Sequence, residues 1–240
     1  MIIDRGHISI TEGEVIIMTE MEAVRSRHSV RNYQDKRIEK EQIISINKRI
    51  EELNKEGNIH LQFVEDSSST FSKLFNKAVG LGSAPSVIAC VGPDDDTLDE
   101  RIGYYGQKLV IYAQQLGLNT CWVGTFNRKK IPVEISDGER LVIAIAIGYG
   151  QTQGKQRKTK TADEVVIDLK DVPDWFHAGV EAALLAPTAI NQQKFEIIYN
   201  ENEEVEFKDL GGVLSKIDIG IVKCNFEIGV ADYKSHYDNA

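Results

Sequence analysis

Apolar residues recur along this chain at spacings of three and four in some stretches, and in unbroken or alternating runs in others. Spacings of three and four are typical of one face of a helix. They predict helices at about 20–28, 40–55, 98–116, 171–186 and 214–230. Gly57 and Gly117 follow the second and third of these as stop signals. Pro187 ends the fourth, because the residue before a proline leaves the helical region.

The predicted strands are shorter. Residues 84–92 and 141–147 are compact apolar runs, which predict buried strands, and the second is expected to be central and covered on both faces. Residues 60–65 and 194–199 show the alternation typical of strands. Residues 119–126 form a further apolar stretch with a glycine inside it.

Helices and strands interleave along the whole chain, and no repeat or low-complexity linker divides it. This pattern predicts one α+β domain over residues 18–240, with a central mixed β-sheet flanked by helices. Residues 1–17 precede the first predicted helix and form an N-terminal arm whose status the sequence leaves open. They are either an extra arm or the product of an upstream start.

Composition narrows the class of protein. The 240 residues carry a formal net charge of −9, and this acidity disfavours general binding to nucleic acids or anionic membranes. No apolar run approaches the roughly 20 residues that span a bilayer. The three cysteines form no close pair and no metal-ligand cluster, and the N-terminus lacks the order of a signal peptide. We therefore expect a cytoplasmic protein with no metal site, no nucleic-acid partner and no membrane anchor.

Positive charge is concentrated in two places, residues 25–31 and residues 154–160. If the first stretch ends a helix, Arg27 and Arg31 lie four apart on one face, where their guanidinium groups suit a phosphate. The alternative is a solvated basic turn with no ligand. The second cluster is not a P-loop, because Gln156 stands where serine or threonine is needed.

Four separated segments together resemble the nitroreductase family of FMN enzymes. Residues 27–31, Arg-His-Ser-Val-Arg, resemble its phosphate-binding signature. Residues 117–124, Gly-Leu-Asn-Thr-Cys-Trp-Val-Gly, resemble the segment beside the flavin ring. Residues 155–158, Lys-Gln-Arg-Lys, resemble the second phosphate-binding site. Residues 186–193, Ala-Pro-Thr-Ala-Ile-Asn-Gln-Gln, resemble the motif Ala-Pro-Ser-Ala-x-Asn-x-Gln. The resemblance covers the chain from about residue 18 to residue 231.

The sequence departs from the family pattern in two ways. The Ala-Pro-Ser motif usually follows the first two helices, whereas here its counterpart comes after the second basic cluster. The chain therefore resembles a rearranged branch in which this helix–loop–strand module sits late. Lys194-Phe195 stands where the family has proline and an aromatic residue. The resemblance therefore supports a cofactor role less strongly for Gln193 than for Asn191.

The resemblance implies a nitroreductase-like fold, bound FMN, and NADH or NADPH as the electron donor. By family position, Arg31 would lie near N1 and O2 of the flavin, and the backbone of Gly124 near N5. No side-chain nucleophile is then needed, because the cofactor carries the reaction. The implied cofactor site consists of Arg27, His28, Ser29, Arg31, Trp122, Val123, Gly124, Thr125, Lys155, Arg157, Pro187, Thr188, Ala189, Asn191 and Gln193.

The function implied by the resemblance is hydride transfer from NADH or NADPH, through FMN, to a nitroaromatic, a quinone or a similar small acceptor. The alternative is a flavin-binding protein with little turnover, such as a sensor or a storage protein. The resemblance also implies a homodimer with shared active sites, in which one chain gives the arginine segment and the other the Ala-Pro-Thr loop. The late position of that loop leaves open whether it serves its own or the partner's site.

Overall fold

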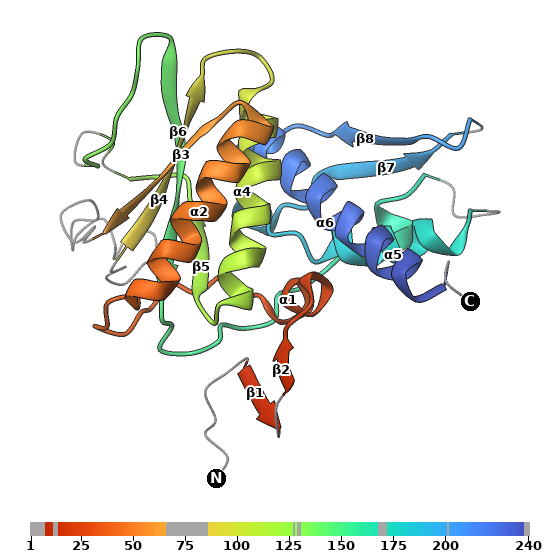
Figure 1. Ribbon diagram of the computed structural model, residues 1–240. Coiled ribbons are helices and arrows are strands. Elements are labelled where there is room, and N and C mark those ends of the chain that lie inside the picture. Colours follow the sequence, from red (N-terminus) through yellow and green to blue (C-terminus); the bar gives the residue numbers. More distant parts are fainter. Residues whose placement is uncertain are drawn as a thin grey trace.

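A four-stranded sheet with helices packed against it forms one side of the computed structural model of the protein (Figure 1). The sheet order is β3 (His60–Glu65), β4 (Ser86–Pro93), β6 (Glu139–Gly148) and β5 (Asn119–Val123). All four strands were predicted, although β5 ends three residues early. The structure describes residues 8–11, 14–65, 86–126, 128, 131–167, 172–200 and 202–237, so the first two residues predicted for β4 lie outside it.

The prediction of a mixed sheet is wrong, because all three strand pairings in this sheet are antiparallel. Between described residues, the parallel pairings are isolated bridges, such as that of Ser29 with Thr120. The expected burial of residues 141–147 on both faces is confirmed. Ile145 faces the main core beneath the helices, whereas Ala144 faces a smaller apolar cluster on the other side. Cover on both faces explains why the strand is apolar throughout.

The helices extend from the sheet toward the opposite side of the molecule (Figure 1). α2 (Lys40–Gly57) and α4 (Leu98–Gln115) lie beside the sheet, α6 (Ser215–Tyr237) packs on α4, and α5 (Asp174–Leu184) packs on α6. α6 runs seven residues beyond its predicted end, because no glycine or proline follows Val230 to stop it. The short α1 (Glu20–Ser26) contacts α4, α6 and α5.

The crossing of α4 and α6 requires a glycine on each helix. A Cβ atom added to Gly103 of α4 would collide with the carbonyl oxygen of Ile217, and one added to Gly220 of α6 would collide with that of Glu100. Ile217 lies three residues before Gly220, and Glu100 lies three residues before Gly103, so the contact between the two helices is reciprocal. The two backbones meet without intervening side chains, which joins the sheet side of the molecule to the α5 side.

Two small hairpins complete the fold. β7 (Phe195–Tyr199) was predicted and pairs with β8 (Val205–Asp209), which was not, because its half-exposed charged pattern is a weak strand signal. β1 (Ile8–Thr11) and β2 (Glu14–Ile17) form a second unpredicted hairpin, within the N-terminal arm. Within the described parts of the chain, no helix is long and apolar enough to cross a membrane, and no three His, Cys, Asp or Glu side chains gather as metal ligands.

Candidate functional site

The first arginine stretch leaves the helical conformation before it reaches the site. α1 ends at Ser26, and Arg27 is already extended, with φ −69 and ψ 128. The backbone N–H of Val30 then donates to the carbonyl of Thr120 in β5 at 3.1 Å. The prediction that Arg27 and Arg31 share a helical face is therefore wrong. The stretch runs along the edge of the sheet instead, and both arginines still line one cavity.

Arg27 is a buried cation with unused donors. Only 5% of its surface is exposed, and among the described residues its Nε and Nη1 atoms find no hydrogen-bond acceptor. Burial and then the charge of Arg157 lower the pKa of Arg27 from 12.5 to about 10. The guanidinium nevertheless stays protonated at neutral pH. A buried charge without an acceptor is costly, so this position is suited to an anion.

Arg157, in the loop after β6, is bonded on several sides. Its Nη1 donates to Asn191 Oδ1 at 2.6 Å, and its Nη2 donates to the carbonyls of Leu184 and Ala186 at 2.8 and 2.6 Å. Burial lowers the pKa of Arg157 as well. Because these bonds tie the second basic cluster to the end of α5, Arg157 holds the Ala-Pro-Thr loop in place as well as lining the cavity.

The loop at residues 187–193 has an unusual backbone. Ile190, Asn191 and Gln193 all have positive φ, at 47, 57 and 47°. Asn191 Nδ2 donates to the carbonyl of Lys158 at 2.9 Å, and Gln193 Oε1 accepts the backbone N–H of Lys160 at 3.0 Å. The loop is therefore bonded along its length to the second basic cluster.

Asp218, in the first turn of α6, holds the other side of this loop. Its carboxylate accepts the backbone N–H of Ala189 at 2.9 Å and the side-chain N–H of Gln192 at 2.8 Å. Only 7% of Asp218 is exposed. Burial raises the pKa of Asp218 from 3.8 to about 6, although both hydrogen bonds act in the opposite direction.

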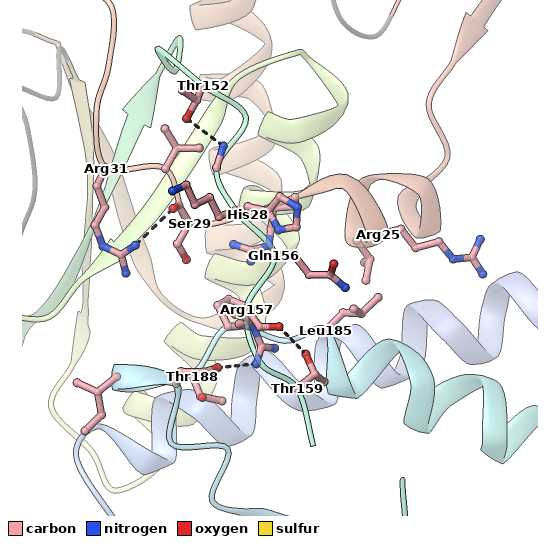
Figure 2. Close-up of a pocket in the computed structure, with 18 of the residues that line it drawn as sticks. Arg25, His28, Ser29, Arg31, Thr152, Gln156, Arg157, Thr159, Leu185 and Thr188 are labelled. Atoms are coloured by element: carbon pink, nitrogen blue, oxygen red, sulfur yellow. Dashed lines mark hydrogen bonds between the residues drawn. The ribbon is translucent and has the colours of Figure 1, made fainter. Parts of the chain in front are cut away.

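A polar cavity of about 830 Å³ opens between these segments. Figure 2 shows His28 and Arg31 from the stretch after α1, Arg157 from the loop after β6, and Thr188 from the late module around one space. Arg25, on α1, points away from this group (Figure 2). The lining is rich in cations and, among the described residues, contains no carboxylate: Arg25, Arg27, Arg31, Lys155 and Arg157.

A second, more apolar cavity of about 240 Å³ adjoins the first. Trp122 of β5 forms part of its wall, and the indole N–H donates to the buried Gln107 at 3.3 Å. Gly124 allows Leu214 to approach, because a Cβ atom there would lie 2.7 Å from the Leu214 side chain. Five residues line both cavities and so mark their junction: Ser29, Arg31, Pro187, Thr188 and Ile190.

The structure brings all the predicted site residues to these two cavities except Gln193. Gln193 is buried and bonds to the backbone at Lys158 and Lys160, so it supports the second basic cluster from behind. Burial and the neighbouring arginines lower the pKa of His28, which favours the neutral imidazole. Burial raises the pKa of the Cys121 thiol, so Cys121 is not poised as a nucleophile.

Sequence reasoning missed several residues that line the cavities, among them Asp218, Ile190 and Leu214. Asp218 left one signal, an acidic residue inside the otherwise apolar stretch from Ile217 to Val222. Ile190 fell at one of the two unspecified positions of the Ala-Pro-Thr motif, so nothing in the sequence marked it. Leu214 precedes the last helix and reaches the cavity only through the packing of α6 beside β5.

With this geometry established, comparison with known proteins gives a family. The family model described as "Putative TM nitroreductase" matches residues 19–230. Because that match spans most of the chain, the protein belongs to this family. The resemblance found in the sequence and the nitroreductase-like fold are thereby confirmed. No curated protein matches the chain.

A solved structure supports the fold, and two others are less similar. A "putative nitroreductase" of Thermotoga maritima is 20% identical, with a TM-score of 0.67, over 95% of this chain and 90% of that chain. An FMN-dependent nitroreductase of Clostridium difficile is also 20% identical, with a TM-score of 0.44, over 63% of this chain and 96% of that one. A "putative nitroreductase" of Exiguobacterium sibiricum, in complex with FMN, is 17% identical, with a TM-score of 0.48, over 65% of this chain and 98% of that chain.

Proposed function

We propose that the protein is an FMN-dependent oxidoreductase that takes hydride from NADH or NADPH and passes it to a nitroaromatic, a quinone or a similar small acceptor. The observation that supports this proposal most directly is the buried guanidinium of Arg27, which has two unused donor atoms. It lines a basic cavity that adjoins a more apolar one. Membership of the nitroreductase family gives the class of reaction.

The residues present fit FMN. A phosphate monoester carries roughly two negative charges near neutral pH, and Arg27 offers it unused donors in a buried position. Lys155 and Arg157 line the same cavity and add positive charge. The adjoining cavity, with Trp122 and Val123 in its wall, offers apolar surface to an aromatic ring.

Bound FMN would supply the hydride chemistry itself. The chain would bind the phosphate through Arg27, and Arg31, which lines both cavities, would place positive charge at their junction. Cys121 stays protonated, which agrees with a reaction that needs no side-chain nucleophile.

The first experiment identifies the cofactor. The purified protein is denatured, and the released small molecule is identified by mass and absorbance. We expect FMN. Recovery of FAD, or failure to bind added FMN, would reject the proposed cofactor. Anaerobic addition of NADH or NADPH then separates an oxidoreductase, whose yellow colour bleaches and returns with an acceptor, from a flavin sensor or storage protein.

We also propose that the protein is a homodimer with shared active sites, as the resemblance implies; two-fold contacts are the commonest oligomer symmetry. Within one chain, Arg31 and Asn191 line the same cavity, so sharing requires the loop of the partner to take the place of the chain's own loop. Sedimentation gives the oligomeric state, and a mixing experiment tests the sharing.

Arg31→Glu and Asn191→Asp proteins, each expected to be inactive, are unfolded and refolded together. Shared sites predict that activity returns, because a mixed dimer has one intact site. If mixed dimers form without recovery of activity, each site belongs to a single chain and the shared-site proposal is rejected.

A further inference from the structure

Ile190 combines a strained backbone with an exposed apolar side chain. Its φ of 47° and ψ of 22° place it in the left-handed region, which a β-branched residue rarely adopts. Its side chain is 87% exposed, more than that of any other large apolar residue in the described part of the chain. Strain of this kind persists only where the surroundings impose it, and it concentrates at ligand-binding sites.

The neighbours of Ile190 fix it from both sides. On the N-terminal side, the Ala189 N–H is bonded to the Asp218 carboxylate at 2.9 Å. On the C-terminal side, Asn191 accepts from Arg157 at 2.6 Å. These contacts tie the two ends of one short turn to α6 and to the second basic cluster. The conformation of Ile190 is therefore imposed by α6 and the second basic cluster.

The position of Ile190 connects it with the ligand. Ile190 lines both cavities, together with Arg31 and Thr188. An apolar side chain held in solvent between a basic and an apolar cavity gains free energy when an aromatic group covers it. A phosphate bound near Arg27 would place the rest of an aromatic phosphate ester across this junction.

We propose that Ile190 is a specificity-determining contact for the aromatic ring of the bound ligand, and that Asp218 and Arg157 position it. The inference rests on the proposed function in one respect, since that function identifies the ring as the isoalloxazine of FMN. It assigns a role to one of the two positions, 190 and 192, that the motif leaves unspecified.

The test uses two substitutions that separate contact from strain. Ile190→Asn removes the apolar surface, but asparagine tolerates the left-handed region. Ile190→Leu keeps the apolar surface without the β-branch. We expect Ile190→Asn to raise the melting temperature of the FMN-free protein by about 2–4 °C, as relief of strain predicts for a chain of this size. We expect Ile190→Leu to bind FMN within about threefold of the wild type, whereas Ile190→Asn binds about tenfold more weakly.

Riboflavin, which has the ring but no phosphate, locates the contact. Ile190→Asn should weaken the binding of FMN and riboflavin by the same factor. Arg27→Met, the comparison variant at the phosphate end, should weaken the binding of FMN alone. Ile44→Asn serves as the surface control, because Ile44 is 64% exposed on α2, lines neither cavity and should leave both affinities unchanged.

The outcomes separate this inference from the proposed function. If the wild type binds FMN and Ile190→Asn binds both ligands equally well, Ile190 makes no ring contact and the inference is overturned, while the proposed function stands. Loss of FMN binding alone in Ile190→Asn also overturns it. A lower melting temperature in Ile190→Asn than in the wild type would show that the backbone of Ile190 is not strained, and would overturn that part of the inference. If the wild type binds neither ligand, the proposed function fails, and the ring contact fails with it.

Discussion

At the scale of single residues, two buried charged groups in the candidate site lower the stability of the folded chain. Arg27 is a charge buried without an acceptor, and Asp218 is a carboxylate buried to 7% exposure. Arg27 lines the basic cavity, and Asp218 lines the apolar one. Residues placed against the preference of the fold indicate selection for binding rather than for stability.

Replacing Arg27 with Met should separate these two effects. Methionine fills a similar volume without charge, so the free energy of unfolding of the FMN-free protein should rise by about 1–4 kcal/mol. FMN binding should weaken by about 1.5–3 kcal/mol, because a charged hydrogen bond to phosphate is lost. Urea unfolding and FMN titration measure the two quantities. A variant that is less stable yet binds FMN normally would mean that Arg27 is structural.

Asp218 should make stability depend on pH. Its pKa is raised to about 6 in the folded protein from 3.8, so between about pH 4 and 6 the folded state binds more protons than the unfolded state. Stability therefore falls as pH rises through this range, and the loss is complete above pH 6. In Asp218→Asn this loss should disappear, a difference of about 1–3 kcal/mol. Urea unfolding at pH 4 and pH 7.5 tests it, and parallel pH curves for the two proteins would contradict it.

At the scale of elements, short connections between helices and strands decide where the site residues lie. α1 begins with a capping box, in which Thr19 and Glu22 bond each other's backbone N–H. It then ends early enough for Ser29 to bridge to β5. The α4–α6 crossing sets the position of Asp218 relative to β5, because Gly103 and Gly220 let the two backbones touch.

Gly103→Ala should reverse the usual effect of this substitution. Inside a helix, alanine normally stabilises relative to glycine by about 0.5–1 kcal/mol. Here the new methyl group would meet the backbone of Ile217, so we expect a loss of about 1–3 kcal/mol in unfolding free energy. Gly220→Ala should do the same, and the double variant should lose less than the sum, because one shift of α6 relieves both collisions. Additive losses would show that the two contacts are independent.

At the scale of the whole molecule, a buried chain of polar side chains links the site to the far helices. Trp122 donates to Gln107 of α4, Gln107 donates to Asn225 of α6 at 2.9 Å, and Asn225 donates to the carbonyl of Ala182 in α5 at 3.1 Å. Because buried polar groups need partners, this chain fixes the register of three helices relative to β5. Both β5 and α6 contribute residues to the wall of the apolar cavity.

The N-terminal arm should be dispensable for this assembly. The cap of α1 comes from Thr19 and Glu22, and Gln115 donates to the carbonyl of Met18, all outside residues 1–17. The family model also begins at residue 19. A protein lacking residues 1–17 should therefore melt within about 2 °C of the full chain and bind FMN equally well. Calorimetry and titration test this, and a large fall in melting temperature would assign the arm to the domain.

The sequence alone determined most of the elements, although not β1, β2 or β8, and the segments that meet at the two cavities. Periodicity located α2, α4 and α6, because an amphipathic helix repeats its apolar positions locally. Continuous runs located β4 and β6 for the same local reason. Four short motifs gave the candidate residues through their resemblance to the nitroreductase family, and all of these except Gln193 line the two cavities.

Only the tertiary structure decided how these parts are paired and oriented. The antiparallel sheet, the extended course of Arg27 to Arg31 and the buried position of Gln193 depend on partners far away in sequence, and local patterns do not record them. Asp218 and Ile190 became visible for the same reason. The carboxylate acts through an N–H some thirty residues away, and the isoleucine is unusual only in its backbone conformation, which neighbouring segments impose.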